Sequence, residues 1–172
     1  ASGREARVYY LWFIQQIDKR VDYLSSFLEA TNVNCILDYS EESIDKLWQW
    51  YRSCRNYIKR SEMEMEQAKE YYPKGLHDFI PQYRLSKTSS EIGMDIAIYF
   101  GETLIHNHNQ LKWDYIKKAK TSVYYHQPVV VGFKHNIPLA PWAVVTNCAV
   151  GEEKRNEDNN LLYKYKVWEE YL

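Results

Sequence analysis

The residues with the clearest potential for chemistry lie between positions 102 and 108. Glu102 and His106 are four positions apart, so a helix would place both side chains on one face, and His108 follows within reach. One carboxylate and two imidazoles form a ligand set that zinc or iron accepts. One interpretation of the sequence is therefore a metal-dependent hydrolase centred on Glu102, His106 and His108.

Other features of the sequence argue against this chemistry. The spacing is not that of the HExxH motif of zinc hydrolases, and His106 lies where the helix is expected to fray. The letters of His106, Asn107 and His108 match the name of the HNH nucleases, but that name describes a hairpin-plus-helix fold, and the order of elements here differs. Asp95 falls near the same helix face as Glu102, so a second alternative is acid–base catalysis by this pair of carboxylates. We predict no catalytic residue and no cofactor.

A structural role is the alternative for Glu102. A carboxylate on an apolar helix can accept a hydrogen bond from the indole N–H of Trp113 in the following strand. Glycine costs a helix about 1 kcal/mol relative to alanine, so Gly101 indicates the close approach of another group. We therefore expect Gly101, Glu102 and Trp113 to join the helix to the sheet.

Hydrophobic periodicity predicts the elements that position these residues. Apolar residues recur every three or four positions over residues 4–30, and a second helix begins after the capping residue Ser40. Two long helices joined by a short loop predict an antiparallel hairpin. A polar helix follows, with the capping-box spacing of Ser61 and Glu64, and ends at Pro73.

A central helix and a small sheet come next. Thr88 and Glu91 have the spacing of a capping box, and apolar residues occupy so much of this helix that we expect it near the middle of the fold. Alternation and Val- and Tyr-rich composition predict three strands, at residues 111–115, 122–133 and 142–150. A turn at residues 117–120 joins the first two strands, and a polar loop at 151–160 precedes a closing helix.

These elements predict the α+β class: an N-terminal helical hairpin, a central helix, a small antiparallel sheet of about three strands and a C-terminal helix. A chain of 172 residues is in the range of one domain, so we expect residues 1–172 to form a single domain. Its helical part covers about residues 4–108, and its sheet and closing helix cover about residues 110–172.

The composition of the chain argues against nucleic acids and membranes as partners. The net charge is −1, which gives no electrostatic footprint for nucleic acid, and no apolar run reaches the ~20 residues that span a bilayer. The first residues lack the layout of a signal peptide. Cys35, Cys54 and Cys148 form no CxxC pair and are best interpreted as free thiols. We expect a cytoplasmic protein with no nucleic-acid partner and no membrane partner.

The aromatic residues suggest a different partner. The chain has 16 Tyr and 6 Trp, and several of them do not fit the predicted inward faces. Surplus aromatic residues often mark a partner surface, although slightly wrong helical phases would give the same impression. The candidate binding residues are Trp12, Trp50, Tyr57, Tyr71 and Tyr72. The function we predict first is therefore that of a non-enzymatic protein-interaction domain, and the metal-dependent hydrolase is the alternative.

A resemblance gives this prediction a concrete form. The motif MDIAIYFGETLIHNHNQLKW, followed by QPVVVGF and LYKYKVWEEYL, resembles a family of small cytosolic proteins from Gram-positive bacteria. That family combines a D-I-x-x-Y-F-G-E helix, a tryptophan after a short turn and a Q-P-V strand. The resemblance covers about residues 92–172, and the LDYSEES helix start also matches. Proteins of this kind include immunity proteins, so the resemblance implies a toxin-neutralising immunity protein whose partner is a toxin, and implies no catalytic residue.

Overall fold

The computed structural model describes residues 2–117, 122–150 and 160–172. In chain order its elements, with η for a 3-10 helix, are α1 (Gly3–Ala30), α2 (Glu41–Cys54), β1 (Tyr57–Lys59), α3 (Glu62–Tyr71), η1 (Lys74–Phe79), β2 (Tyr83–Leu85), α4 (Lys87–Asn107), β3 (Lys112–Tyr115), β4 (Pro128–Val131), η2 (Lys134–Asn136), α5 (Pro141–Val150) and α6 (Leu161–Glu169). Helices and strands are both present, so the α+β class is confirmed. Within the described ranges, no helix is both long and apolar enough to cross a membrane.

Serine side chains cap the starts of four helices, α1 to α4, because their oxygens accept hydrogen bonds from backbone N–H groups that have no partner inside the helix. Ser40 caps α2 as predicted, and Ser61 and Glu64 form the predicted capping box of α3. The predicted start of α4 at Thr88 was wrong. Ser86 is the capping residue, and its side-chain oxygen accepts a hydrogen bond from the backbone N–H of Ser89.

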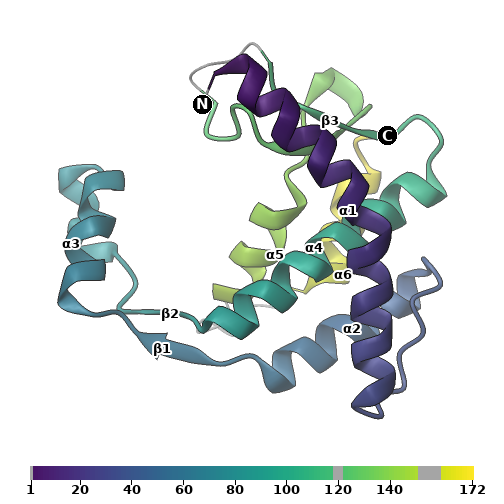
Figure 1. Cartoon of the computed structure of the whole chain (residues 1–172), viewed down its shortest axis with the longest axis horizontal. Coiled ribbons are helices and arrows are strands. Elements are labelled where there is room, and N and C mark those ends of the chain that lie inside the picture. Colours follow the sequence, from purple (N-terminus) through teal and green to yellow (C-terminus); the bar gives the residue numbers. More distant parts are fainter. Residues whose placement is uncertain (1, 118–121, 151–159) are drawn as a thin grey trace.

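Helix α4 is the centre of the packing (Figure 1) and contacts α5, α1 and α2. Helix α1 also packs on β3, whereas the main contacts of α2 are with α6 and α4. Residues 31–40 redirect the chain, so α1 and α2 do not form the closely packed hairpin that was predicted. The largest fully buried side chains, which come from α2, α4 and α6, are Trp48, Tyr51, Tyr99, Tyr165 and Phe100.

The strands form two separate two-stranded antiparallel sheets, so the prediction of one three-stranded sheet was wrong. Strands β3 and β4 pair as expected, with Trp113 opposite Val130. The turn predicted at residues 117–120 and the loop predicted at 151–160 lie outside the described residues, apart from Lys117 and Asn160.

The segment predicted as a third strand is helix α5. Pro141 is the first helical residue, where its missing N–H costs nothing because that position has no partner inside the helix. A short apolar run does not distinguish a buried strand from a buried helix by periodicity alone. Four of the buried positions of α5, Pro141, Val145, Cys148 and Ala149, have the i, i+4, i+7, i+8 spacing of one helix face.

Residues 57–85 form a projecting arm, which consists of β1, α3, η1 and β2 (Figure 1). Strands β1 and β2 pair antiparallel at its base, with Tyr57 opposite Leu85. Helix α2 ends at Cys54, and Ile58 lies in β1. Neither α3 nor η1 contains a buried residue. The arm therefore adds little to the core of the rest of the chain, here called the body.

Candidate functional site

The three residues proposed as metal ligands have different partners. Glu102 accepts a hydrogen bond from Trp113, and the ring of His106 stacks on a tyrosine in the connection between α1 and α2. His108 Nε2 lies 3.2 Å from Glu169 Oε1. Among the described residues, no group of three or more His, Cys, Asp or Glu side chains is arranged to hold a metal ion. The structure therefore does not assemble the ligand set that the sequence allowed.

The second carboxylate on this side of α4 also has its own partner. Asp95 is buried, and its Oδ1 lies 2.5 Å from Nε of Arg20 on α1. Burial raises the pKa of Asp95, and the hydrogen bond and charge of Arg20 act in the opposite direction. The open alternative of paired acid–base carboxylates would require Asp95 and Glu102 to share a site, whereas each bonds to a different residue.

Gly101, Glu102 and Trp113 are in direct contact. Trp113 Nε1 donates to Glu102 Oε1 at 2.6 Å, which is the hydrogen bond expected from the sequence. A Cβ atom on Gly101 would lie 2.5 Å from Cζ2 of Trp113, so the indole occupies the space of a side chain. Burial raises the pKa of Glu102, whereas the bond from Trp113 lowers it. The ring of Phe13 on α1 packs edge-on against the same indole, with centroids 5.0 Å apart.

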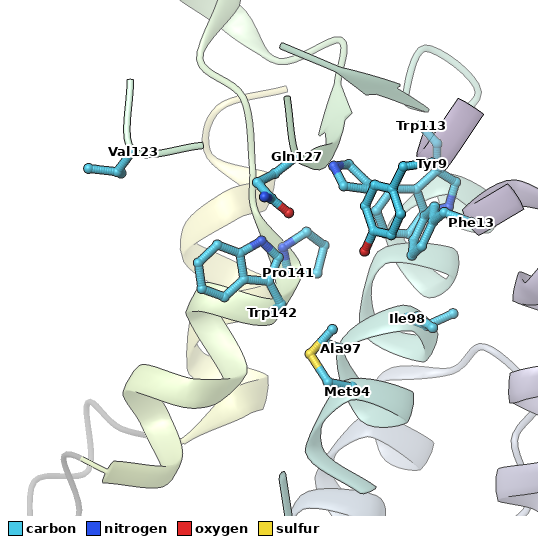
Figure 2. A pocket seen from close by; sticks show the side chains of 11 residues that line it. Tyr9, Phe13, Met94, Ala97, Ile98, Trp113, Val123, Gln127, Pro141 and Trp142 are labelled. Atoms are coloured by element: carbon cyan, nitrogen blue, oxygen red, sulfur yellow. The ribbon is translucent and has the colours of Figure 1, made fainter. Parts of the chain in front are cut away.

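Trp113 is also a wall of an apolar pocket of about 320 Å³ (Figure 2). The pocket lies among α1, α4, the β3–β4 sheet and the start of α5, which supply its lining residues Tyr9, Phe13, Met94, Ala97, Ile98, Trp113, Val123, Gln127, Pro128, Pro141 and Trp142. No residue in this lining carries a charge. The polar groups at its edge are the hydroxyl of Tyr9, the amide of Gln127 and the indole N–H of Trp142.

The indole N–H of Trp142 differs from the other two polar groups because it is buried. Its Nε1 atom has no hydrogen-bond partner among the described residues. In Figure 2 the nitrogen edge of this indole faces the side of the pocket where Gln127 lies. Because this atom has less than 1 Å² of accessible surface, neighbouring atoms of the protein cover it, and the pocket does not expose it.

The structure divides the five candidate binding residues among three locations. Trp12 lies on the outer side of α1, with 54% of its surface exposed. Tyr71 and Tyr72 are exposed on the arm, Tyr71 to 85%. Tyr57 lies at the base of the arm. Trp50 is partly buried against the core, so it does not contribute to an exposed surface.

Hydrogen bonds at the base of the arm connect it to the body. The hydroxyl of Tyr57 donates to the carbonyl of Ala149 at the end of α5. The backbone N–H of Ser86 donates to the carbonyl of Asn56 at 2.8 Å, which closes the base beyond the β1–β2 pair. Farther out, Arg84 Nη2 lies 2.6 Å from Glu64 Oε1 and joins β2 to α3. These contacts give the arm a defined position despite its exposure.

Sequence reasoning missed part of the apolar surface of the arm. Its exposed large apolar side chains are Tyr57, Ile58, Met63, Tyr71, Tyr72, Leu76, Phe79 and Tyr83. Phe79, with 75% of its surface exposed, follows a Pro- and Gly-containing segment that has no periodicity to indicate a surface. A signal was available in the polar helix α3, which has no wide apolar face with which to pack on the body. Ile80 is buried but belongs to neither apolar cluster of the body.

The arm and the pocket are thus different kinds of surface. The arm presents aromatic and aliphatic side chains to solvent, and the pocket is a cavity with an uncharged, mainly apolar lining. No known family model, no curated protein and no solved structure matches the chain.

Proposed function

We propose that the chain is a protein-binding domain and that the arm is its contact surface. The observation that supports this proposal is the exposure of large apolar side chains on an element in which neither helix contains a buried residue. Large apolar side chains that are exposed together on one part of a domain often mark an interface. Tyrosine and phenylalanine suit the centre of an interface because they cover much area with few rotatable bonds.

The charges of α3 define the chemistry of the expected partner. The helix carries four glutamates and one lysine, and two of these glutamates bond to cations within the arm. The other two, Glu62 and Glu70, are exposed beside Met63 and Tyr71. A complementary surface would have an apolar groove bordered by lysine or arginine. The resemblance to immunity proteins makes a secreted toxin one class of such partner, which the arm would neutralise by covering its surface.

The test is affinity capture with the full chain as bait, beside two variants. The arm variant is Tyr71→Ser/Phe79→Ser, which removes two highly exposed side chains without opening the core. The matched control is Val8→Ser/Ile36→Ser, which removes two exposed apolar side chains outside the arm. All three proteins should have the same melting temperature.

We expect a protein that the wild type and the control capture and the arm variant loses. The purified partner should bind the wild type one-to-one in calorimetry, and the arm variant should bind at least about tenfold more weakly. Equal capture by the arm variant would contradict the proposal. Light scattering supplies a second check, because a dimer that dissociates in the arm variant would make a second copy of the chain the occupant of the arm.

A further inference from the structure

We propose that the outward face of α1 is a docking surface for a second copy of the chain, and that the two copies pair α1 against α1 in antiparallel orientation. Figure 1 shows α1 along the outside of the body, where its buried face packs on α4 and β3. The outward face belongs to the body and is distinct from the arm. The proposal follows from the exposed apolar side chains of this face, from its charges and from the order of both along the helix.

The middle of the outward face is apolar. Val8, Leu11 and Trp12 each expose half or more of their surface, and their spacing of three and four positions makes them neighbours on one side of the helix. Ile14, about one turn after Leu11, is also exposed. Single exposed apolar side chains are normal on a protein surface, whereas a cluster of them on one helix face often marks an interface.

The two ends of the same face carry opposite charges. Arg4 and Arg7 precede the apolar cluster, and Asp18 and Asp22 follow it at helical spacing. All four are exposed, and none has an ion-pair partner among the described residues. Like charges three or four positions apart on a helix repel one another. A partner that brings the opposite charge to each end would therefore be stabilised by both.

The other charges of these segments leave the sign of each end unchanged. Glu5 is the one acidic residue of the first turn, and its carboxylate accepts a hydrogen bond from the backbone N–H of Ser2 at 2.7 Å in the capping box. Lys19 lies beside the two aspartates, whereas Arg20 is bonded to the buried Asp95 on α4. The first end is thus positive overall and the second end is negative overall.

The order of these residues specifies an antiparallel pair centred on Leu11. Arg4 and Asp18 are each seven positions, about two helical turns, from Leu11, and Val8 and Ile14 are each three positions from it. With Leu11 on a twofold axis, Arg4 of one copy faces Asp18 of the other, and Val8 faces Ile14. A parallel pair would instead place the arginines of both copies together. The outward face is therefore complementary to itself in charge as well as in apolar surface.

The size of this face sets the strength of the dimer. An interface that is one helix wide belongs to the weak class, which buries less than about 1,200 Å² in total. We expect light scattering on the full chain, at concentrations from about 5 to 500 µM, to give a mass that rises from that of a monomer towards that of a dimer. Exposed charges are screened by salt, so raising the ionic strength from about 0.05 to 0.5 M should weaken the association.

A substitution at the centre of the face tests the apolar contact. Leu11→Lys brings two ammonium groups together at the twofold axis and should weaken dimerisation by about tenfold or more. The side chain of Leu11 is half exposed, so the monomer should keep its melting temperature. The matched control is Lys74→Asp/Lys134→Asp, which changes two exposed residues outside α1 and should dimerise like the wild type.

Two charge variants test the pairing of the ends. Arg4→Asp/Arg7→Asp makes both ends of the face negative, and Asp18→Lys/Asp22→Lys makes both ends positive. Each variant alone should remain monomeric, because its ends repel those of a second copy. An equimolar mixture of the two should form a one-to-one heterodimer, because each end then meets the opposite charge.

A wild type that stays monomeric over the whole range, a dimer that survives Leu11→Lys, or charge variants that fail to associate in the mixture would each overturn the proposal. The arm variant Tyr71→Ser/Phe79→Ser should dimerise like the wild type, and a dimer that only this variant loses would place the interface on the arm instead. The capture control Val8→Ser/Ile36→Ser changes one residue of the α1 face, so it should dimerise more weakly and still capture the partner of the arm. Dimerisation and capture thus report on different surfaces.

Discussion

The indole N–H of Trp113 and the carboxylate of Glu102 are joined by a hydrogen bond of 2.6 Å that connects strand β3 to helix α4. The partner of Glu102 is thus a neutral donor, and burial raises the pKa of its carboxyl group. The same indole fills the space beside Gly101 and forms a wall of the pocket. One side chain therefore determines the junction between helix and sheet and the shape of the cavity.

We expect Trp113→Phe to lower the free energy of unfolding by about 1–3 kcal/mol at neutral pH, because the carboxylate of Glu102 loses its donor. The hydrogen bond lowers the pKa of Glu102, so the variant should raise it further. The deficit should grow as the pH rises through the pKa of Glu102 in the folded wild type, because only the ionised form needs the donor strongly. Denaturant unfolding between pH 4 and pH 8 measures this trend.

The control for this experiment is the same substitution in a Glu102→Gln background. There the cost of Trp113→Phe should be independent of pH, because it contains only the lost packing of the indole and its hydrogen bond to a neutral amide oxygen. A deficit with the same pH dependence in both backgrounds would show that the bond to Glu102 is not its origin.

We expect Gly101→Ala to destabilise the protein by about 1–3 kcal/mol, although alanine is the better helix former by about 1 kcal/mol. The new Cβ would lie 2.5 Å from Cζ2 and 2.6 Å from Cη2 of Trp113, and 3.2 Å from Cγ of Pro141. Gly3→Ala, at the start of α1, is the matched control because its Cβ would meet nothing within 4 Å. The melting temperature should fall for Gly101→Ala, and it should rise or stay the same for Gly3→Ala.

Local signals in the sequence were sufficient for the elements that have them. The capping residues Ser40 and Ser61 and the period of residues 4–30 indicated three helices, and alternation around Trp113 indicated strand β3. The hydrogen bond between Trp113 and Glu102 was also within reach, because only eleven positions separate the two residues. These features depend on neighbours that lie close in the chain.

Features that depend on distant residues could not be derived in this way. Strands β1 and β2 have three residues each and pair across the whole arm, so neither has a periodic signal of its own. Helix α5 is short and apolar, and its helical form follows from its burial against α4. The pocket combines Tyr9, Trp113 and Trp142, whose positions in the sequence give no sign that they meet.

We expect Arg20→Met to lower the free energy of unfolding by about 2 kcal/mol at neutral pH. The side chain of Asp95 is only 3% exposed, so its carboxylate would keep the cost of burial after losing the cation 2.5 Å away. Arg20 is partly exposed, which places the expected loss below that of a fully buried pair. The double variant Arg20→Met/Asp95→Asn should recover most of the stability, since neither charge remains.

The pH dependence of this pair has a definite sign. Burial raises the pKa of Asp95 in the folded protein, and loss of Arg20 should raise it further. The deficit of Arg20→Met should therefore shrink as the pH falls through the folded pKa of Asp95 in the variant, because the protonated group needs no cation. A deficit that stays constant between pH 4 and pH 8 would assign it to packing of the Arg20 side chain instead.

We expect the body to fold without the outer part of the arm. Replacing residues 60–82 by Asn-Gly would leave Lys59 and Tyr83, a pair in the β1–β2 register, joined by a two-residue hairpin turn. Since α3 and η1 bury no residue, the shortened chain should unfold cooperatively, with a change in stability of about 1 kcal/mol or less. Loss of cooperative unfolding would mean that the arm supports the core. A chain that melts like the wild type but no longer captures the partner would assign the arm to binding rather than to folding.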